Sequence, residues 1–395
     1  GAIEAVLTIA QPGAAEPRPP HVVVSSTEER SPSAQLLLTA TGQLSERAGV
    51  DAGLASPFEQ LARLALPGAA GEQAAASGAG FDAVGFSAAG EAPLPPERDD
   101  PDALDSSRLT DFGSAILATL VALDSQPGEL APSPEAYIRL SGNIVPGWTL
   151  SLLALALLLP PAALAVSGLA RASRGGGGPD RAWRWAAAWV VPPAGALLVL
   201  YALGLSGVVA SPPLPYDPSR YALGLTEALA MVLLVGVALG LWWVLGLRRL
   251  PFAVERATLA AAAGGVCVIA MLVLWVANPY LALLCAPLPH LTALHCLRPR
   301  VARVAAIPVA AVAFVPLLLA LAQVAEALDW GLTLPWQLVL LVAGGGAGPL
   351  ETLSALAAIT SVAALIWATM APVRRRAPDR GRGRERPAVA HPASD

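Results

Sequence analysis

Hydrophobic residues follow two different patterns along the chain, and the pattern changes near residue 148. Before this point, short apolar runs alternate with amphipathic stretches, whereas long apolar runs follow it with few polar residues between them. Short runs rich in β-branched residues are typical of strands, and apolar residues three and four positions apart are typical of helices. The pattern therefore predicts an α/β domain followed by an all-α bundle.

The first part has the order strand, strand, helix, helix, strand, helix. We predict strands at 2–10, 21–26 and 81–88, and helices at 31–49, 56–66 and 105–125. Ser56 and Glu59 have the spacing of a capping box, and Asp105 precedes a helix start. Helices that alternate with strands indicate a layered α/β domain, and three strands are few for a complete sheet, so we expect the C-terminal portion of a larger domain. We assign residues 1–130 to this domain and 131–147 to a linker.

Long apolar stretches in the second part predict membrane-spanning helices. About 20 apolar residues cross a hydrocarbon core of about 30 Å, because each residue of a helix rises about 1.5 Å. Six stretches of this kind lie near 148–170, 185–209, 222–247, 257–277, 304–324 and 351–372. The stretch 280–296 is shorter and contains Pro287 and Pro289, and 335–348 is too short to span and ends in glycines.

Arginine placement predicts the orientation of these spans. Arginines are concentrated at 171–184, 248–256, 298–303 and 373–386, whereas the alternate loops contain only Arg220. Positively charged loops stay in the cytoplasm. The alternation requires that 280–296 crosses and that 335–372 makes one net crossing, with 335–348 at half depth or at the interface. We therefore expect about seven spans over 148–372 in the plasma membrane, residues 1–147 outside, and a disordered cytoplasmic tail at 373–395.

Composition agrees with this division. The chain has 395 residues, of which 55 % are hydrophobic and 14 % charged, and its mean hydropathy is +0.58, which is more apolar than an ordinary soluble protein. Residues 1–147 hold 19 of the 29 acidic residues and 7 of the 25 basic ones. All three cysteines lie after them, which excludes a disulfide framework from the first part. No basic, aromatic-rich surface indicates nucleic-acid binding.

Three ionisable residues in the predicted spans are candidates for function: His290, His295 and Glu227. Such groups are costly to bury in a membrane, so they often serve a purpose there. The two histidines lie about 140° apart on an ideal helix, so a shared metal or proton-relay site requires a distorted helix. The alternative is that they cap a proline-broken helix. Glu227 is either a substrate-path carboxylate or an acid at a helix start.

Two segments of the first part resemble a known enzyme family. GEQAAASGAGFDAVGFSAAGE (71–91) and RDDPDALDSSRLTDFGSAILATLVALD (98–124) are similar to the end of the di-zinc aminopeptidase and glutamate-carboxypeptidase-like metallopeptidases. The arrangement is closer to the bacterial membrane-anchored members with a multi-span C-terminal half, to which NPY…LPHL (278–291) is also similar. The resemblance covers most of residues 1–125 and, more weakly, the spans. It implies a peptidase-like domain on the outer side of the membrane.

The resemblance places two metal-ligand positions in this chain, and neither holds a ligand. The family's zinc-binding aspartate corresponds to Ala10, and its histidine corresponds to Pro95 if residues 99–102 match its Asp-Thr-Pro-Asp. The other ligands and the general-base glutamate would lie upstream of Gly1, so zinc is expected only in a longer form. A two-metal site needs a shell of histidines and carboxylates. We therefore assign no catalytic or metal residue, and interpret His21 as a surface residue and Asp99, Asp100, Asp102 and Asp105 as loop carboxylates and a helix cap.

Three functions follow as hypotheses. The first is a membrane-anchored zinc-metallopeptidase-like protein that is inactive as this chain. The second is a non-catalytic membrane scaffold that binds a peptide or protein on the outer side. The third is a transporter-like protein, which depends only on His290, His295 and Glu227.

Overall fold

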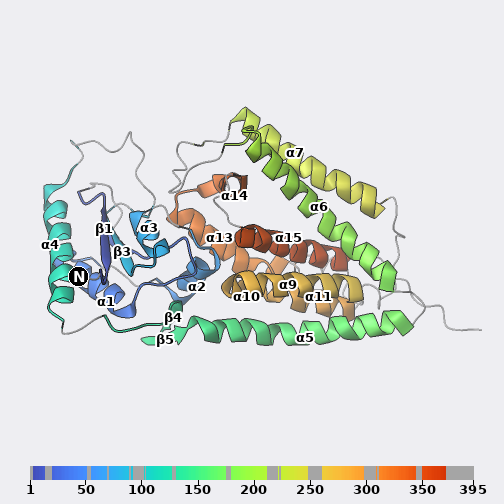
Figure 1. Cartoon of the computed structure of the whole chain (residues 1–395), viewed down its shortest axis with the longest axis horizontal. Helices are drawn as coiled ribbons and strands as arrows, with labels where there is room; N and C mark the ends of the chain where they lie inside the picture. The colour runs from blue at the N-terminus through green and yellow to red at the C-terminus, as the bar shows by residue number, and fades with distance from the viewer. Residues whose placement is uncertain are drawn as a thin grey trace, which may run out of the picture.

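Two structurally different parts follow one another in the protein, as the sequence pattern predicts. The computed structural model describes residues 3–13, 20–50, 55–68, 71–88, 90–91, 102, 104–126, 130–174, 179–210, 221, 224–247, 260–297, 308, 311–343 and 349–370. Helices predominate, and a small sheet lies with α1 to α4 at one end of an elongated molecule, while long apolar helices form the rest (Figure 1).

Three strands form the main sheet, in the order β1-β3-β2. The central strand β3 (Ala83–Ser87) is buried throughout and pairs parallel to β1 (Val6–Ala10) and antiparallel to β2 (His21–Val23). Helices α1 (Ala34–Ala48) and α4 (Ser106–Asp124) pack together over it, with the rings of Phe86 and Phe112 edge to face at 6.2 Å. The three strands are shorter than the predicted ranges 2–10, 21–26 and 81–88, because only residues 6–10, 21–23 and 83–87 pair with a neighbouring strand.

Helix caps confirm the local sequence signals. The Ser56 hydroxyl accepts from the Glu59 amide at the start of α2 (Pro57–Ala65), and the Asp105 carboxylate accepts from the amides of Ser107 and Arg108 at the start of α4. Helix α3 (Glu72–Gly78) is not predicted by the sequence pattern. It contains mainly small residues, so it has little hydrophobic periodicity.

The segment 131–147, predicted as a linker, contains an antiparallel hairpin of β4 (Tyr137–Leu140) and β5 (Asn143–Pro146). Ser141 and Gly142 have φ values of 51° and 83°. Two adjacent positive φ angles are the geometry of a type I′ turn, whose twist matches that of the flanking strands. The hairpin leads directly into α5 (Gly147–Arg174) and contacts α2, so the α/β part extends to the first long helix.

Helices lie at all of the predicted spans. They are α5, α6 (Pro179–Leu205), α7 (Leu225–Trp242) continued by the π-helix η4 (Trp243–Leu247), η5 (Ala260–Gly264) with α9 (Gly265–Ala277), α10 (Pro279–Cys285) with α11 (Pro287–Leu297), α13 (Val315–Ala327), and α15 (Pro349–Met370). The short helices η6 (Gly331–Thr333) and α14 (Leu334–Ala343) precede the glycine run. Among the described residues, two helices are long and apolar enough to cross a membrane alone, Gly147–Arg174 and Leu225–Leu245.

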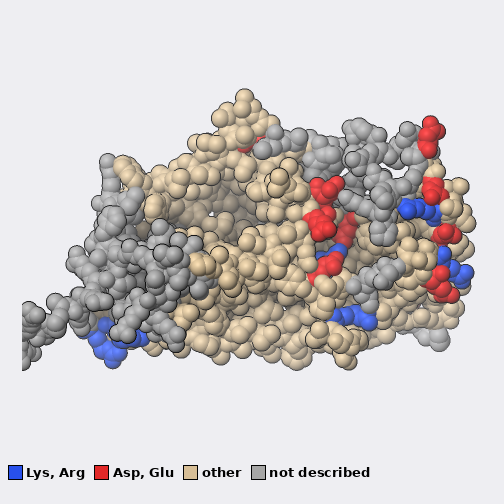
Figure 2. Space-filling view, turned by 180° about the vertical axis from the view of Figure 1, so that it is seen from behind, with Lys and Arg blue, Asp and Glu red and all other residues tan. Residues whose placement is uncertain are grey.

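Apolar side chains are exposed on these two helices. In the most apolar 18-residue stretch of the helix Leu225–Leu245, only 6 % is buried. The side chains of Leu225 and Val232 are 79 % and 68 % exposed. The core helix of a soluble protein would bury such residues, so the exposure favours contact with lipid. On the face that Figure 2 shows, the described surface of the helical part has few charged side chains apart from arginines near its far end, in keeping with exposed Arg171 and Arg174 at the end of α5.

Candidate functional site

The candidate site implied by the family resemblance lies where β1 ends. Ala10 is the last residue of β1, pairs in register with Ser87, and exposes only a methyl side chain. The Asp105 amide donates to the Gly13 carbonyl at 2.9 Å, which joins the segment after β1 to the start of α4. The second family position, Pro95, lies outside the described residues, as do Asp99 and Asp100.

Asp105 has a structural role at this edge of the sheet. Its Oδ1 accepts from the Ser107 hydroxyl at 2.6 Å and from the Ser107 and Arg108 amides at 2.9 and 3.1 Å. The hydroxyl bond, followed by the bond from the Arg108 amide, lowers the pKa of this carboxyl below its ordinary value. The helix-cap prediction is therefore confirmed. Within the described part of the chain, no three His, Cys, Asp or Glu side chains could hold a metal ion together.

His21 is not the surface residue that the sequence suggests. It begins β2, is half-buried, and lines a cavity between the sheet, α1, α2 and the hairpin. The cavity forms because residues 137–146 fold back as the hairpin instead of leaving as a linker. The residues that line the cavity with His21 therefore come from segments more than 100 residues apart.

A partly buried ion-pair cluster centres on Arg63 in α2. Its Nη2 lies 2.9 Å from Glu59 Oε1, and its Nη1 lies 2.5 Å from Glu91 Oε1, whose side chain is only 6 % exposed. Burial alone lowers the pKa of Arg63, but attraction to Glu91 and bonding to Glu59 outweigh it, so the pKa is raised. The cluster ties the segment after β3 to α2.

Asn278 joins the two parts of the protein. Its buried side chain donates from Nδ2 to the carbonyls of Leu64 and Ala65, at 3.1 and 3.2 Å, and accepts at Oδ1 from the Leu281 amide at 2.6 Å. One side chain thus caps the C-terminus of α2 and the N-terminus of α10. Helix ends leave carbonyls and amides without intrahelical partners, and Asn278 satisfies both kinds.

The hydrophobic core also continues across this joint. Leu64 and Ala65 of α2 belong to the same buried cluster as Leu281 and Leu284 of α10 and Leu150 of α5. The Gly147 amide donates to the Ala136 carbonyl at 2.7 Å, and a side chain at Gly147 would clash with the Tyr280 hydroxyl. The α/β part is therefore packed onto the helices.

The polar candidates in the helices are not brought together by the described contacts. His290 Nδ1 lies 2.9 Å from the Ala286 carbonyl, at the predicted break between α10 and α11, which agrees with the capping alternative. His295 lies on α11, but its side chain is outside the described residues. Glu227 lies in the first turn of α7, which packs on α6, whereas α11 packs on α15, η5 and α5.

Sequence reasoning missed the residues that build the joint. NPY…LPHL (278–291) was singled out only for its resemblance, and neither Arg63 nor the hairpin was a candidate. The sequence did offer one signal, an asparagine immediately before a proline at the start of an apolar run, since asparagine is a preferred helix N-cap. No protein-family model matches the chain, and no curated protein matches it either.

Proposed function

We propose that this chain is a multi-span membrane protein with a metallopeptidase-like α/β domain that is inactive as a hydrolase here and acts as a scaffold for a peptide or protein partner outside the cell. The observation that carries the proposal is the joint at Asn278, where one buried side chain and one continuous core unite α2 with the helices. A flexible tether is enough to anchor an enzyme. A joint made of hydrogen bonds and a shared core would instead hold the domain at a set height and angle to the membrane.

The membrane part of the proposal is supported by length and surface. Helix α5 has 28 residues and is therefore about 42 Å long, which exceeds a hydrocarbon core of about 30 Å. Its C-terminal turn carries Arg171 and Arg174, as a cytoplasmic end would. The opposite end of α5 follows the hairpin, so the α/β domain lies on the outer side in this arrangement.

The non-catalytic part of the proposal is supported by Ala10. In the family that the sequence resembles, this strand ends in a zinc-binding aspartate, and a methyl group has no lone pair for a metal. The resemblance assigns the second ligand position to Pro95, which is equally unable to bind zinc.

Zinc analysis and peptidase assays test the proposal on the full chain. The protein is purified without chelators, its zinc content is measured, and turnover of leucine p-nitroanilide is followed. We expect less than stoichiometric zinc and no turnover above a mock preparation. Stoichiometric zinc together with turnover that a chelator abolishes would refute the scaffold and favour an active peptidase.

Topology is tested separately, by labelling introduced cysteines with a membrane-impermeant maleimide. Cys267 and Cys285 are buried and free, so they give little background, and Cys296 is replaced with serine in every variant. We expect Ser125→Cys to react in intact cells and Ser394→Cys to react only after permeabilisation. The reverse pattern would contradict the proposed orientation.

A further inference from the structure

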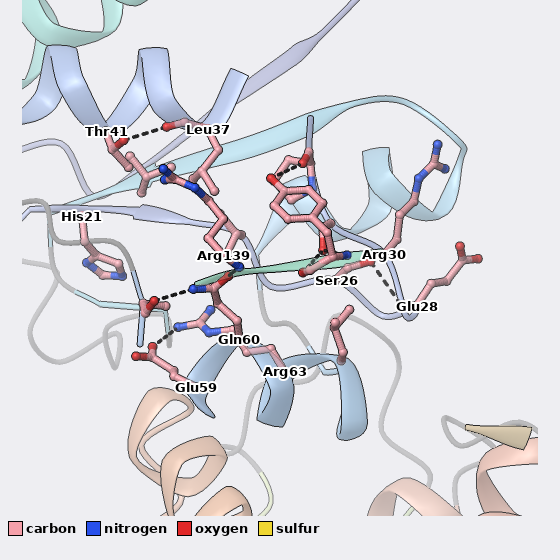
Figure 3. A pocket seen from close by; sticks show the side chains of 17 residues that line it. His21, Ser26, Glu28, Arg30, Leu37, Thr41, Glu59, Gln60, Arg63 and Arg139 are labelled. Atoms are coloured by element: carbon pink, nitrogen blue, oxygen red, sulfur yellow. Dashed lines mark hydrogen bonds and ion pairs between the residues drawn. The ribbon is translucent and has the colours of Figure 1, made fainter. Parts of the chain in front are cut away.

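A cavity of about 290 Å³ lies beside the edge strand β2, enclosed by α1, α2 and β4 (Figure 3). Its size is close to the lower limit of small-molecule pockets, about 300 Å³. Val24, Leu37 and Leu64 supply apolar lining, and the polar lining includes Gln60 and Arg139 together with His21, Glu28 and Glu59. A lining of this composition suits a small ligand that is apolar at one end and charged at the other.

Among the described residues that line the cavity, Arg139 combines a buried guanidinium nitrogen that makes no hydrogen bond with the lack of a carboxylate in ion-pair contact. Its backbone amide donates to Gln60 Oε1 at 2.7 Å, and its side chain extends from β4 across the cavity toward Thr41 and Leu37 (Figure 3). The Nη1 atom is buried and has no hydrogen-bond partner in the part of the chain that the structure describes. A buried guanidinium nitrogen without an acceptor is costly, so this position favours an anionic ligand.

The other two arginines of the cavity have close neighbours: Arg63 Nη1 also makes no hydrogen bond of regular geometry, but it lies 2.5 Å from Glu91 Oε1. Arg63 is paired with Glu59 and Glu91, and Arg30 is turned away from the cavity, with Nη1 3.5 Å from the Ser77 carbonyl (Figure 3). The Glu59 carboxylate is engaged by Arg63 and does not compensate Arg139. Arg139 is therefore the cation that a ligand in the cavity would meet.

We infer that this cavity binds a carboxylate that carries a small aliphatic group. The planar guanidinium of Arg139 offers two parallel N–H donors, which match the two oxygens of a carboxylate. Val24, Leu37 and Leu64 would contact the aliphatic part. Either the C-terminal residue of a peptide or a free short-chain carboxylic acid has this chemistry. The inference does not depend on the scaffold proposal, because it rests on the cavity alone.

Calorimetric titration of the full chain in detergent micelles tests this inference. The probes are 4-methylpentanoate and the tripeptide Gly-Gly-Leu, each compared with its uncharged amide. We expect at least one carboxylate to bind with a Kd of about 1 mM or tighter and its amide at least tenfold more weakly. Binding of the tripeptide alone identifies a peptide C-terminus, and binding of 4-methylpentanoate alone identifies a free acid.

Two arginine variants separate the ligand contact from general effects. Arg139→Gln should weaken carboxylate binding at least tenfold, whereas Arg30→Gln, at a lining residue whose guanidinium is turned away from the cavity, should change it less than twofold. If Arg139→Gln does not fold, the test is the difference in affinity between each carboxylate and its amide for the unsubstituted protein. The inference is overturned if neither carboxylate binds, if acid and amide bind equally, or if folded Arg139→Gln binds as well as the unsubstituted protein.

Discussion

Replacing Asn278 with alanine should loosen the joint between the α/β part and the helices. The substitution removes three hydrogen bonds and leaves the Leu64 and Ala65 carbonyls and the Leu281 amide without this partner in a buried place. Each buried group left unsatisfied costs about 1–3 kcal/mol. Because the three bonds share one side chain and are not independent, we expect a total loss of about 3–4 kcal/mol in the free energy of unfolding.

Asn143→Ala is the matched control. Asn143 is exposed in β5, so its replacement should change the free energy of unfolding by no more than about 0.5 kcal/mol. Denaturant unfolding of both variants in the same micelles measures the difference. Amide hydrogen exchange then shows where protection is lost, and the loss should be concentrated in α2 and the first turn of α10. A cost below about 1 kcal/mol for Asn278→Ala, or equal costs for the two variants, would refute the reasoning.

Three further predictions concern ionised and apolar residues. The pKa of Asp105 is lower in the folded protein than its ordinary value of 3.8, so the ionised carboxylate stabilises α4 at pH values above 3.8. This stability is lost as the pH falls below 3.8. Asp105→Asn should therefore flatten the pH dependence of the melting temperature below about pH 4. Glu91→Ala should lower the free energy of unfolding by about 3 kcal/mol, because Arg63 loses its buried partner. Glu59→Ala removes a more exposed partner of Arg63 and should lower the free energy of unfolding by less than about 1 kcal/mol. Leu233→Arg, on the exposed apolar surface of α7, should make the free energy of membrane insertion about 3–4 kcal/mol less favourable if α7 lies in the bilayer, which a glycosylation-reporter assay measures.

If Asp105→Asn leaves the pH dependence of the melting temperature below about pH 4 unchanged, the carboxylate cap adds no measurable stability to the folded protein. Equal costs for Glu91→Ala and Glu59→Ala would show that burial does not distinguish the two pairs. Normal insertion of Leu233→Arg would indicate that α7 is not surrounded by lipid.

Local signals in the sequence were reliable where the interaction itself is local. Ser56 and Asp105 bond to amides two or three residues away, so their spacing is sufficient to predict the caps. The break between α10 and α11 was likewise visible as Pro287, since proline has no amide hydrogen to continue a helix. The hairpin at 137–146 escaped prediction because its strands are four residues long and its Ser-Gly turn lies within a segment interpreted as a linker.

The sequence by itself determined the division into an α/β part and an apolar helical part, and the positions of the long helices, because hydrophobic periodicity reports which face of each segment is buried. Only the tertiary structure decided which segments contact one another. Asn278 lies 213 and 214 positions from the carbonyls that it binds, and Arg139 shares a cavity with α1, about 100 residues earlier. No local pattern encodes such pairs, because they depend on how the elements pack and not on the order of residues within any one of them.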